Sequence, residues 1–278
     1  MYDLTRLNRA LASTVYSGKL HFVSVTGSTN SDARQAALLG APDGSVYLAD
    51  EQTAGRGRSN HGWESAAGEG LYVSVLLRPK WDAARLQWLP LAAGLAAAEA
   101  IETLTGLTVD LRWPNDLMIG SCKVGGILVE AKLTSDPQRS SVDSVVVGVG
   151  INVHQRNFRD EIGATSLDRE AEEEAWRVSA PSNRNAGAIR INRQELLLAM
   201  LNRLQIESAL LGAAEGQEGL RKRMEKSSTW LVGRSVKVHG PQACNGITMG
   251  LDEQGMLLVQ TESGLISVCT GGIRDAAR

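Results

Sequence analysis

The sequence predicts an α+β fold, in which a mixed β-sheet packs with helices and a small β-barrel follows at the C-terminus. Two observations support this fold class. Over residues 1–230, apolar segments of strand length are interspersed with longer stretches of helical periodicity. After Gly233, short alternating strands follow one another, joined by Gly and Asp turns, as in a barrel of about 45 residues. We therefore expect two domains, 1–230 and 231–278.

Strands are expected where apolar and β-branched residues run between turn signals. The nearly continuous apolar run 145–149 indicates a strand that is buried on both faces. Within 111–133, the glycine-led pair Gly120–Ser121 separates two apolar runs and predicts a tight hairpin. The other predicted strands lie at 20–25, 45–50, 70–78, 235–240, 245–252, 256–261 and 264–269.

Helices are expected where apolar residues recur with the helical period. The stretch 84–104 has this period, and Pro90 either bends the helix or marks its start. An alanine-rich helix follows the first strand, with Asn30 or Ser31 as N-cap and Gly40 as the stop. Two further helices are expected at 192–211 and 216–228.

The stretch from His154 to about Ile191 differs from the rest of the first domain. It contains the acidic run DREAEEE and the polar run PSNRNAG. This composition is typical of a solvated surface connection with room for one short helix.

Composition and charge exclude several classes of protein. The chain has 278 residues, 43% hydrophobic and 22% charged, a net charge of −2 and a pI of about 6.1, so it lacks the basic balance of a nucleic-acid-binding protein. The absence of a long apolar run and of a signal peptide predicts a cytoplasmic protein. Three cysteines without CxxC spacing argue against a disulfide framework and a zinc site: Cys122, Cys244 and Cys269.

A glycine-rich loop follows the strand 45–50 and carries two cations. Arg56 and Arg58 alternate with Gly55 and Gly57, so the backbone can approach a ligand while both guanidinium groups stay available to oxyanions. A solvated hairpin tip would have the same composition, and this short motif alone does not separate the two interpretations.

Two further clusters favour a nucleotide site. The WPND turn at 113–116 offers an amide and a carboxylate, a set that suits a magnesium-bound polyphosphate, although a plain type I turn has the same residues. Lys123 precedes Gly125 and Gly126, next to which a ligand can pack against the backbone. A lysine that only reaches out to solvent is the alternative. No Walker loop or dinucleotide-binding fingerprint is present in the sequence.

Five short motifs in this order, followed by a small barrel, resemble the biotin protein ligases (biotin–acetyl-CoA-carboxylase ligases). The resemblance extends from about Leu20 to the C-terminus. The motifs are STN (28–30), QTAGRGR (52–58), RWPND (112–116), CKVGGILVE (122–130) and GVGIN (148–152).

The resemblance implies a class II synthetase-like biotin/lipoate ligase core with a C-terminal SH3-like barrel. It also implies an activity in two steps. Biotin and ATP, with Mg²⁺, form biotinyl-5′-AMP and pyrophosphate, and a lysine of a biotin carboxyl carrier protein then takes the biotinyl group. No tightly bound prosthetic group is expected. The carrier belongs to acetyl-CoA carboxylase or a related biotin-dependent carboxylase.

The resemblance also assigns site residues. Lys123, Arg56 and Arg58 would be catalytic, and Asp116 is the candidate Mg²⁺ contact. The biotin-binding residues would be Ser28, Thr29, Asn30, Gln52, Arg56, Gly57, Arg58, Lys123 and Gly126. The ATP-binding residues would be Arg58, His61, Trp63, Arg112, Asn115, Asp116, Lys123 and Asn152.

Two positions depart from the family pattern. His61 stands where the loop usually carries an arginine, and Arg112 stands where a lysine usually precedes WPND. A forked guanidinium differs from a point charge, and we expect Arg112 to contact phosphate.

The expected partners follow from the same resemblance. About 19 residues precede the first strand, too few for the DNA-binding domain of some family members, so we expect a monofunctional ligase without a nucleic-acid partner or membrane contact. A homodimer that pairs through sheet edges is left open.

Two alternatives remain open at this point. Lipoate ligases and octanoyl transferases share the core, and Cys122 beside Lys123 would suit an acyl-cysteine intermediate. The GRGR loop, the RWPND turn and the terminal barrel favour biotin. A non-catalytic sensor of biotin or its adenylate is the other alternative.

Overall fold

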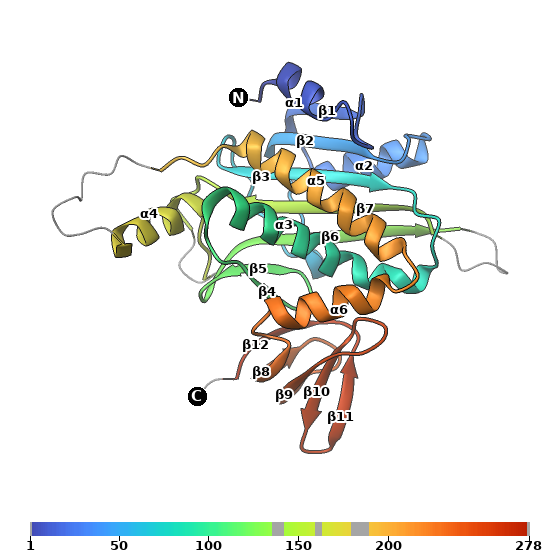
Figure 1. The fold of residues 1–278 in the computed structure, drawn as a ribbon, viewed down its shortest axis with the longest axis vertical. Coiled ribbons are helices and arrows are strands. Elements are labelled where there is room, and N and C mark those ends of the chain that lie inside the picture. Colours follow the sequence, from blue (N-terminus) through green and yellow to red (C-terminus); the bar gives the residue numbers. More distant parts are fainter. Residues whose placement is uncertain (1, 135–141, 159–162, 179–188, 277–278) are drawn as a thin grey trace.

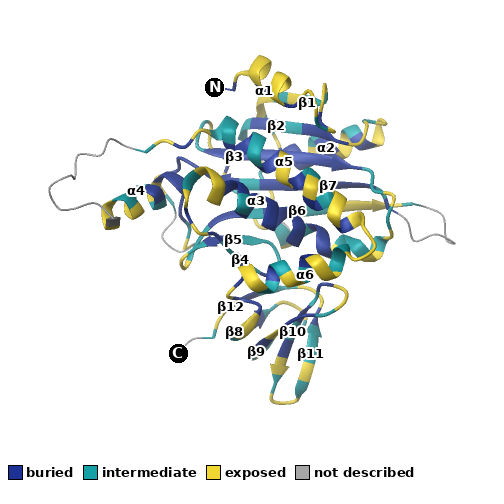
Figure 2. Ribbon diagram, in the orientation of Figure 1, coloured by how far each residue is buried: buried dark blue, intermediate teal, exposed yellow. Residues whose placement is uncertain are grey.

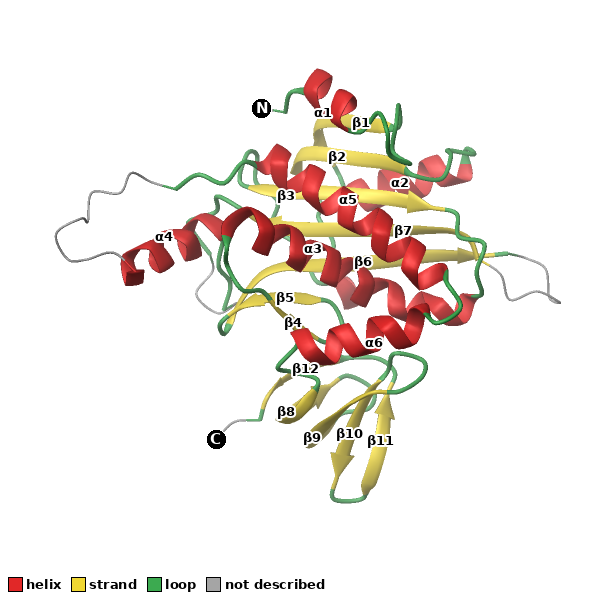
Figure 3. Cartoon of the chain, in the orientation of Figure 1, coloured by secondary structure: helices red, strands yellow, loops and turns green. Residues whose placement is uncertain are grey.

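The computed structural model describes residues 2–134, 142–158, 163–178 and 189–276, which form two β-sheets and their covering helices (Figures 1 and 3). In the larger sheet, β1 and β2 are parallel, and all other neighbours pair antiparallel, which confirms the predicted mixed sheet. Its strands, in the order β1-β2-β3-β7-β6-β5-β4, are β1 (Leu20–Thr26), β2 (Ser45–Gln52), β3 (Gly70–Leu77), β4 (Asp110–Arg112), β5 (Asp116–Ile119), β6 (Cys122–Leu133) and β7 (Val142–Asn152).

The central strands are buried on both faces because helices cover each side of the sheet (Figure 2). Val75 and Val147 face the main core, whereas their neighbours Leu76 and Val146 face a second cluster that includes Ala33 of helix α2. This alternation follows from the period of two along a strand. The helices are α1 (Leu4–Ala10), α2 (Thr29–Leu38), α3 (Leu89–Thr105), α4 (Leu167–Val178), α5 (Arg193–Gly212) and α6 (Gly216–Ser227), with 3-10 helices η1 (Arg58–Asn60) and η2 (Ala83–Trp88).

The smaller sheet packs below α6 and continues the main core (Figure 1). Trp88 touches the position where a Cβ on Gly255 would lie, and the Trp113 indole donates a hydrogen bond to the Gly255 carbonyl at 3.4 Å. The SH3-like character of this sheet and the domain division at residue 230 stay predictions. Its strands, in the order β11-β10-β9-β8-β12, are β8 (Val232–His239), β9 (Cys244–Leu251), β10 (Leu257–Thr261), β11 (Gly264–Val268) and β12 (Gly272–Asp275).

The local predictions agree with most of these elements. The strand around 145–149 is buried on both faces, and the 111–133 hairpin turns at Gly120 with a φ of 56°. Pro90 lies in the first turn of α3, so it marks the helix start. The predicted cap of α2 was wrong: the helix already begins at Thr29, and Ser28, whose backbone is extended, is its N-cap.

The polar stretch 154–191 is only in part a surface connection. It contains the predicted short helix, α4, but Asp168 in this helix is buried. Its carboxylate accepts a hydrogen bond from the Ile191 N–H at 2.9 Å and lies 2.8 Å from His154 Nδ1. Residues 159–162 and 179–188 of this stretch lie outside the described residues.

Within the described ranges, no helix combines the length and the hydropathy that a membrane crossing requires. The alanine-rich helix α3, the most apolar of them by composition, instead packs against α5 and the large sheet.

Burial of three tyrosines predicts a loss of stability at high pH. Burial raises the pKa of Tyr2 to about 12, with Arg193 lowering and Asp50 raising it, and burial also raises the pKa of Tyr16 and Tyr72. The unfolded chain ionises its phenols from about pH 10. The free energy of unfolding is therefore expected to be unaffected by these groups below pH 10 and to fall as the pH rises above it.

This prediction can be checked by following tyrosinate absorbance between pH 9 and 13 in buffer and in denaturant. In buffer, most of the tyrosinate absorbance should appear at pH values well above the ionisation midpoint of the denatured chain. It should appear together with unfolding. A native titration that coincides with the denatured one would contradict it.

Candidate functional site

One cavity of about 680 Å³ brings together residues from separate parts of the sequence. This volume is typical of a site for a small molecule or cofactor. The start of α2, the loop after β2, the β4–β5 turn and the strands β6 and β7 all contribute to its lining. Of the predicted site residues, these line it: Ser28, Thr29, Asn30, Gln52, Arg56, Gly57, Arg58, His61, Trp63, Arg112, Asn115, Asp116, Lys123 and Gly126.

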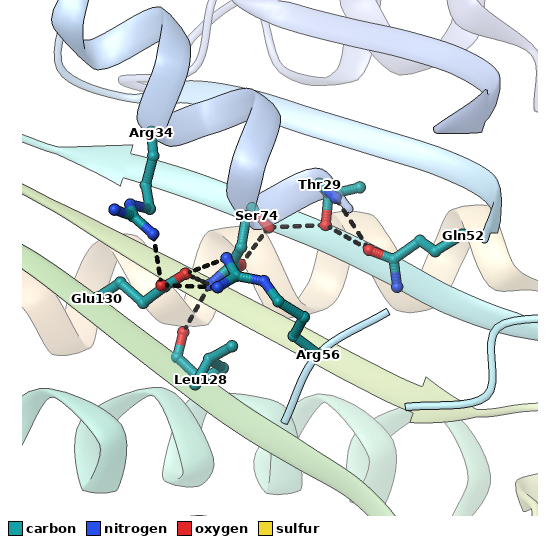
Figure 4. Close-up of polar contacts among 8 residues, drawn as sticks. Thr29, Arg34, Gln52, Arg56, Ser74, Leu128 and Glu130 are labelled. Atoms are coloured by element: carbon teal, nitrogen blue, oxygen red, sulfur yellow. Dashed lines mark hydrogen bonds and ion pairs between the residues drawn. The ribbon is translucent and has the colours of Figure 1, made fainter. Parts of the chain in front are cut away.

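A polar network fixes the start of α2 at one end of the cavity (Figure 4). The buried Ser74 hydroxyl of β3 lies 2.6 Å from Asn30 Oδ1 and 2.8 Å from Thr29 Oγ1. The Thr29 N–H donates to Gln52 Oε1 at 2.9 Å, so β2 holds the first turn of the helix. Ser28, the N-cap, makes no side-chain capping bond, which leaves its hydroxyl available to a ligand.

Glycines in β7 make room for this network and for the loop. A Cβ on Gly148 would lie 2.0 Å from Asn30 Oδ1, and a Cβ on Gly150 would lie 2.7 Å from Trp63 Nε1. The absence of side chains at these two positions therefore lets Asn30 and Trp63 lie directly on the sheet.

The loop after β2 folds back on itself beside the cavity. Gln52 pairs with Ser65, and Arg56 pairs with Gly62, as isolated antiparallel bridges. The close approach requires Gly55, because a Cβ there would lie 2.3 Å from the Trp63 carbonyl oxygen. Trp63 packs on Gly150 and lines the cavity, so it both anchors the loop and contributes to the site.

The two loop arginines point to different ends of the site. The Arg56 guanidinium forms an ion pair with Glu130 of β6, at 2.8 Å between Nη2 and Oε2 (Figure 4). Arg58 donates to the carbonyl oxygen of Gly271, between β11 and β12, at 3.0 Å and lies 3.5 Å from Asn115 Oδ1. Burial lowers the pKa of the Arg58 guanidinium, and the negative charge of Asp116 partly opposes this shift.

Asp116 organises the cations at the other end of the cavity. Arg112 Nη2 lies 2.7 Å from its Oδ2, and the Lys123 ammonium pairs with its Oδ1. The ammonium also lies 5.4 Å from the centroid of the Trp63 ring, within the range of a cation–π contact. Asp116 thus holds two positive charges at the cavity wall, where they can meet an anion.

The backbone of Lys123 is clamped by a segment that precedes α4. The Lys123 N–H donates to the Gly163 carbonyl at 2.8 Å, and the Thr165 N–H donates to the Lys123 carbonyl at 2.9 Å. Asn152 belongs to this clamp: it does not line the cavity, and its amide donates to the Thr165 carbonyl at 3.0 Å. Cys122 also lies outside the cavity lining.

Sequence reasoning missed several residues at the site. Glu130 is the partner of Arg56, Ser74 orders the start of α2, and His239 and Arg274 of the smaller sheet line the cavity. Burial first, and then the charges of Arg274 and Lys237, lower the pKa of His239. A carboxylate within the apolar stretch VGGILVE was the one available signal for Glu130.

Comparison with known proteins identifies the family. Residues 22–152 match the Biotin/lipoate A/B protein ligase family. The bifunctional ligase/repressor BirA of Bacillus spizizenii is 32% identical over 268 residues, covering 95% of this chain and 76% of that protein. The biotin–acetyl-CoA-carboxylase ligase of Mycobacterium tuberculosis is 31% identical over 266 residues, covering 92% and 88%.

A solved structure agrees in fold over the same extent. The biotin protein ligase from Aquifex aeolicus, in complex with biotin and ATP, matches with a TM-score of 0.73 and 30% identity, covering 93% of this chain and 100% of that chain. The identities, the coverage and the shared fold show that the chain belongs to the biotin/lipoate A/B protein ligase family.

Proposed function

We propose that this protein is a biotin protein ligase, which forms biotinyl-5′-AMP from biotin and ATP and transfers the biotinyl group to a lysine of a carrier protein. One observation carries the proposal: a buried polar cluster at the start of α2 and the cations Arg58, Arg112 and Lys123 meet in one cavity. The biotin protein ligases among the relatives and solved structures support it.

The start of α2 suits the ureido group of biotin. The N-terminus of a helix attracts the negative end of a carbonyl dipole, and the Ser28 hydroxyl is free of a capping bond. Asn30 and Thr29 are held in place by Ser74, so their polar groups are oriented before the ligand binds. The biotin carboxylate then extends toward the cations of the cavity.

The first step joins two anions. An oxygen of the biotin carboxylate attacks the α-phosphorus of ATP, the bond to the bridging oxygen of the β-phosphate breaks, and pyrophosphate leaves. Lys123 and Arg112 place positive charge at this point because both are held by Asp116. Fixed cations stabilise the negative charge that gathers in the transition state, so no protein nucleophile is required.

The second step needs protection from water. Biotinyl-5′-AMP is a mixed anhydride, which hydrolyses when it is exposed. The loop that carries Arg56 and Arg58 lines the cavity, and we expect it to close over the adenylate and shield this bond. The uncharged amine of a carrier lysine then attacks the acyl carbon, AMP leaves with the bonding electron pair, and the nitrogen loses a proton to the solvent as the amide forms.

The described residues do not build a metal site of their own. No group of three or more His, Cys, Asp or Glu side chains within the described ranges could hold a metal ion, and Asp116 is already paired with two cations. A Mg²⁺ ion that accompanies ATP would be held mainly by phosphate oxygens, with Asp116 as the candidate protein contact.

The partners follow from the same proposal. The carrier is a biotin carboxyl carrier domain of a biotin-dependent carboxylase, and the enzyme acts in the cytoplasm without nucleic acid. A homodimer through a sheet edge stays an open alternative. The carrier assignment rests on the chemistry of the reaction and on the biotin–acetyl-CoA-carboxylase ligases among the relatives. The net charge of −2 is the observation that favours an enzyme without a nucleic-acid partner.

The test is release of pyrophosphate by the purified protein. Release should require biotin and ATP together, and radioactive biotin should then appear on a carrier domain but not on the same domain with its acceptor lysine changed to arginine. Biotin binding without pyrophosphate release would indicate a sensor and overturn the proposal. Equal turnover of lipoate or octanoate would indicate the other branch of the family.

A further inference from the structure

Glu130 is an unusual residue for its position. It lies on β6 within the apolar run VGGILVE, directly beside Val146 of β7. Its side chain is 21% exposed, so it is largely withdrawn from solvent. A carboxylate at such a position loses hydration and needs hydrogen-bond donors in compensation.

Donors from three places in the sequence surround this carboxylate (Figure 4). Arg56 of the loop binds both oxygens, at 2.8 Å for Oε2 and 3.2 Å for Oε1. Arg34 of α2 donates to Oε1 at 2.9 Å, and the Asn30 amide donates to Oε2 at 2.9 Å. Both oxygens are therefore shared between the loop and α2.

We infer that Glu130 is a positioning residue that couples closure of the loop to the biotin end of the cavity. Its carboxylate holds Arg56 and, through the same oxygen, the amide of Asn30. The loop arginine is then fixed relative to the helix start that we propose to bind biotin. This inference rests on the proposed function, and it adds a residue that does not itself touch the substrates.

Physical chemistry explains why the loop needs such an anchor. Ordering a residue costs conformational entropy, and a glycine-rich loop loses more of it than most segments. A bidentate pair between arginine and a carboxylate is directional and fixes the guanidinium plane. The pair with Glu130 therefore offsets part of the ordering cost before the adenylate forms.

The alternative is an ordinary surface ion pair, which contributes little. Arg34 offers a matched control for it. It binds the same carboxylate but belongs to α2, lines no part of the cavity and has a side chain that is 56% exposed. If Glu130 only neutralised nearby charge, loss of Arg34 and loss of Arg56 would have similar effects.

The experiment compares the wild type with Glu130→Gln, Arg56→Gln, the double variant and Arg34→Gln. The measured quantities are the dissociation rate of preformed biotinyl-5′-AMP, kcat, KM for biotin and the thermal midpoint. Glu130→Gln keeps the shape and removes the charge. We expect it to speed adenylate dissociation about tenfold, with a smaller change in kcat and a midpoint within a few degrees of wild type.

Coupling within the cycle distinguishes positioning from a general structural role. The double variant should release the adenylate no faster than Arg56→Gln alone, because both changes remove the same pair. Arg34→Gln should release it at the wild-type rate. Additive effects of the two changes, a wild-type rate in Glu130→Gln, or an equal effect of Arg34→Gln would each overturn the inference.

A second readout keeps the inference testable without any ligase activity. Trypsin cleaves after exposed lysines and arginines, so the rate at which peptides ending at Arg56 or Arg58 appear in the unliganded protein reports loop opening. Cleavage should be several times faster in Glu130→Gln than in Arg34→Gln or wild type. Absence of adenylate formation in the wild type would overturn the proposed function alone, whereas equal cleavage rates would overturn the anchor alone.

Discussion

Lys123→Ala is expected to lower the rate of biotin- and ATP-dependent pyrophosphate release by roughly 10²–10³-fold, the typical cost of losing one preorganised group that stabilises transition-state charge. The ammonium is fixed by its pair with Asp116, by the face of Trp63 and by a backbone clamped to 163–165. Because it is already in place, it stabilises the developing charge without a reorganisation cost. Single-turnover release of pyrophosphate at saturating substrates measures this effect directly.

The same strand offers the control. Lys132 of β6 is 56% exposed at its side chain, pairs with Asp143 at 3.5 Å and lies outside the cavity lining. Lys132→Ala should retain the wild-type rate. If Lys123→Ala keeps more than a third of the wild-type rate of pyrophosphate release, with an unchanged thermal midpoint, then Lys123 is not a catalytic residue.

The loss in Lys123→Ala should not be read as the contribution of one contact. Removal of the ammonium leaves Asp116 with Arg112 as its remaining cation among the pairs described above, so the field at the phosphates changes in two ways. Lys123→Arg distinguishes the loss of charge from the loss of the ammonium geometry, because a guanidinium restores the positive charge but not the shape of the ammonium group. Partial recovery of the rate is expected for this variant.

Local sequence patterns predicted most of the elements because period and turn chemistry act over a few residues. The buried run 145–149, the turn at Gly120 and the proline at the start of α3 are examples. The same patterns cannot reveal that β1 and β2 pair in parallel, because parallel pairing is decided by the crossover through α2. The short edge strand β12 was also missed, since four residues carry little periodicity.

The candidate site was predictable to the extent that its chemistry lies in short motifs. The loop arginines, the RWPND turn and Lys123 are close in sequence to glycines or a proline. These residues indicate turns and positions where the backbone can approach a ligand. Asn152 shows the limit of this reasoning: its contact with ATP stays a prediction, and the hydrogen bond from its amide to the Thr165 carbonyl is not predictable from its motif. Such roles depend on contacts between distant segments and require the three-dimensional structure.

Gly148→Ala is expected to damage the biotin end of the site more than its single methyl group suggests. The added Cβ would lie 2.0 Å from Asn30 Oδ1, far inside contact distance, so the amide must move. Asn30 is buried and accepts from Ser74 at 2.6 Å while donating to Glu130 at 2.9 Å. Its displacement breaks both bonds and moves a proposed biotin-binding group.

The expected losses follow from these contacts. Overpacking of a fixed core typically costs 1–3 kcal/mol of stability, and loss of a buried hydrogen-bond partner about as much in binding. We therefore expect the thermal midpoint of Gly148→Ala to fall by several degrees and the dissociation constant for biotin to rise by roughly 10- to 100-fold, measured by calorimetry.

A second variant tests whether the clash with Asn30 is the cause. In an Asn30→Ala background the amide is gone, so the Cβ of Gly148→Ala no longer meets Oδ1 and should cost little further stability. The two changes are thus expected to be strongly non-additive in the free energy of unfolding, because they act on one contact. If the two losses of unfolding free energy are additive, the clash with Asn30 is not the cause. The sheet itself would then require glycine at position 148 in β7.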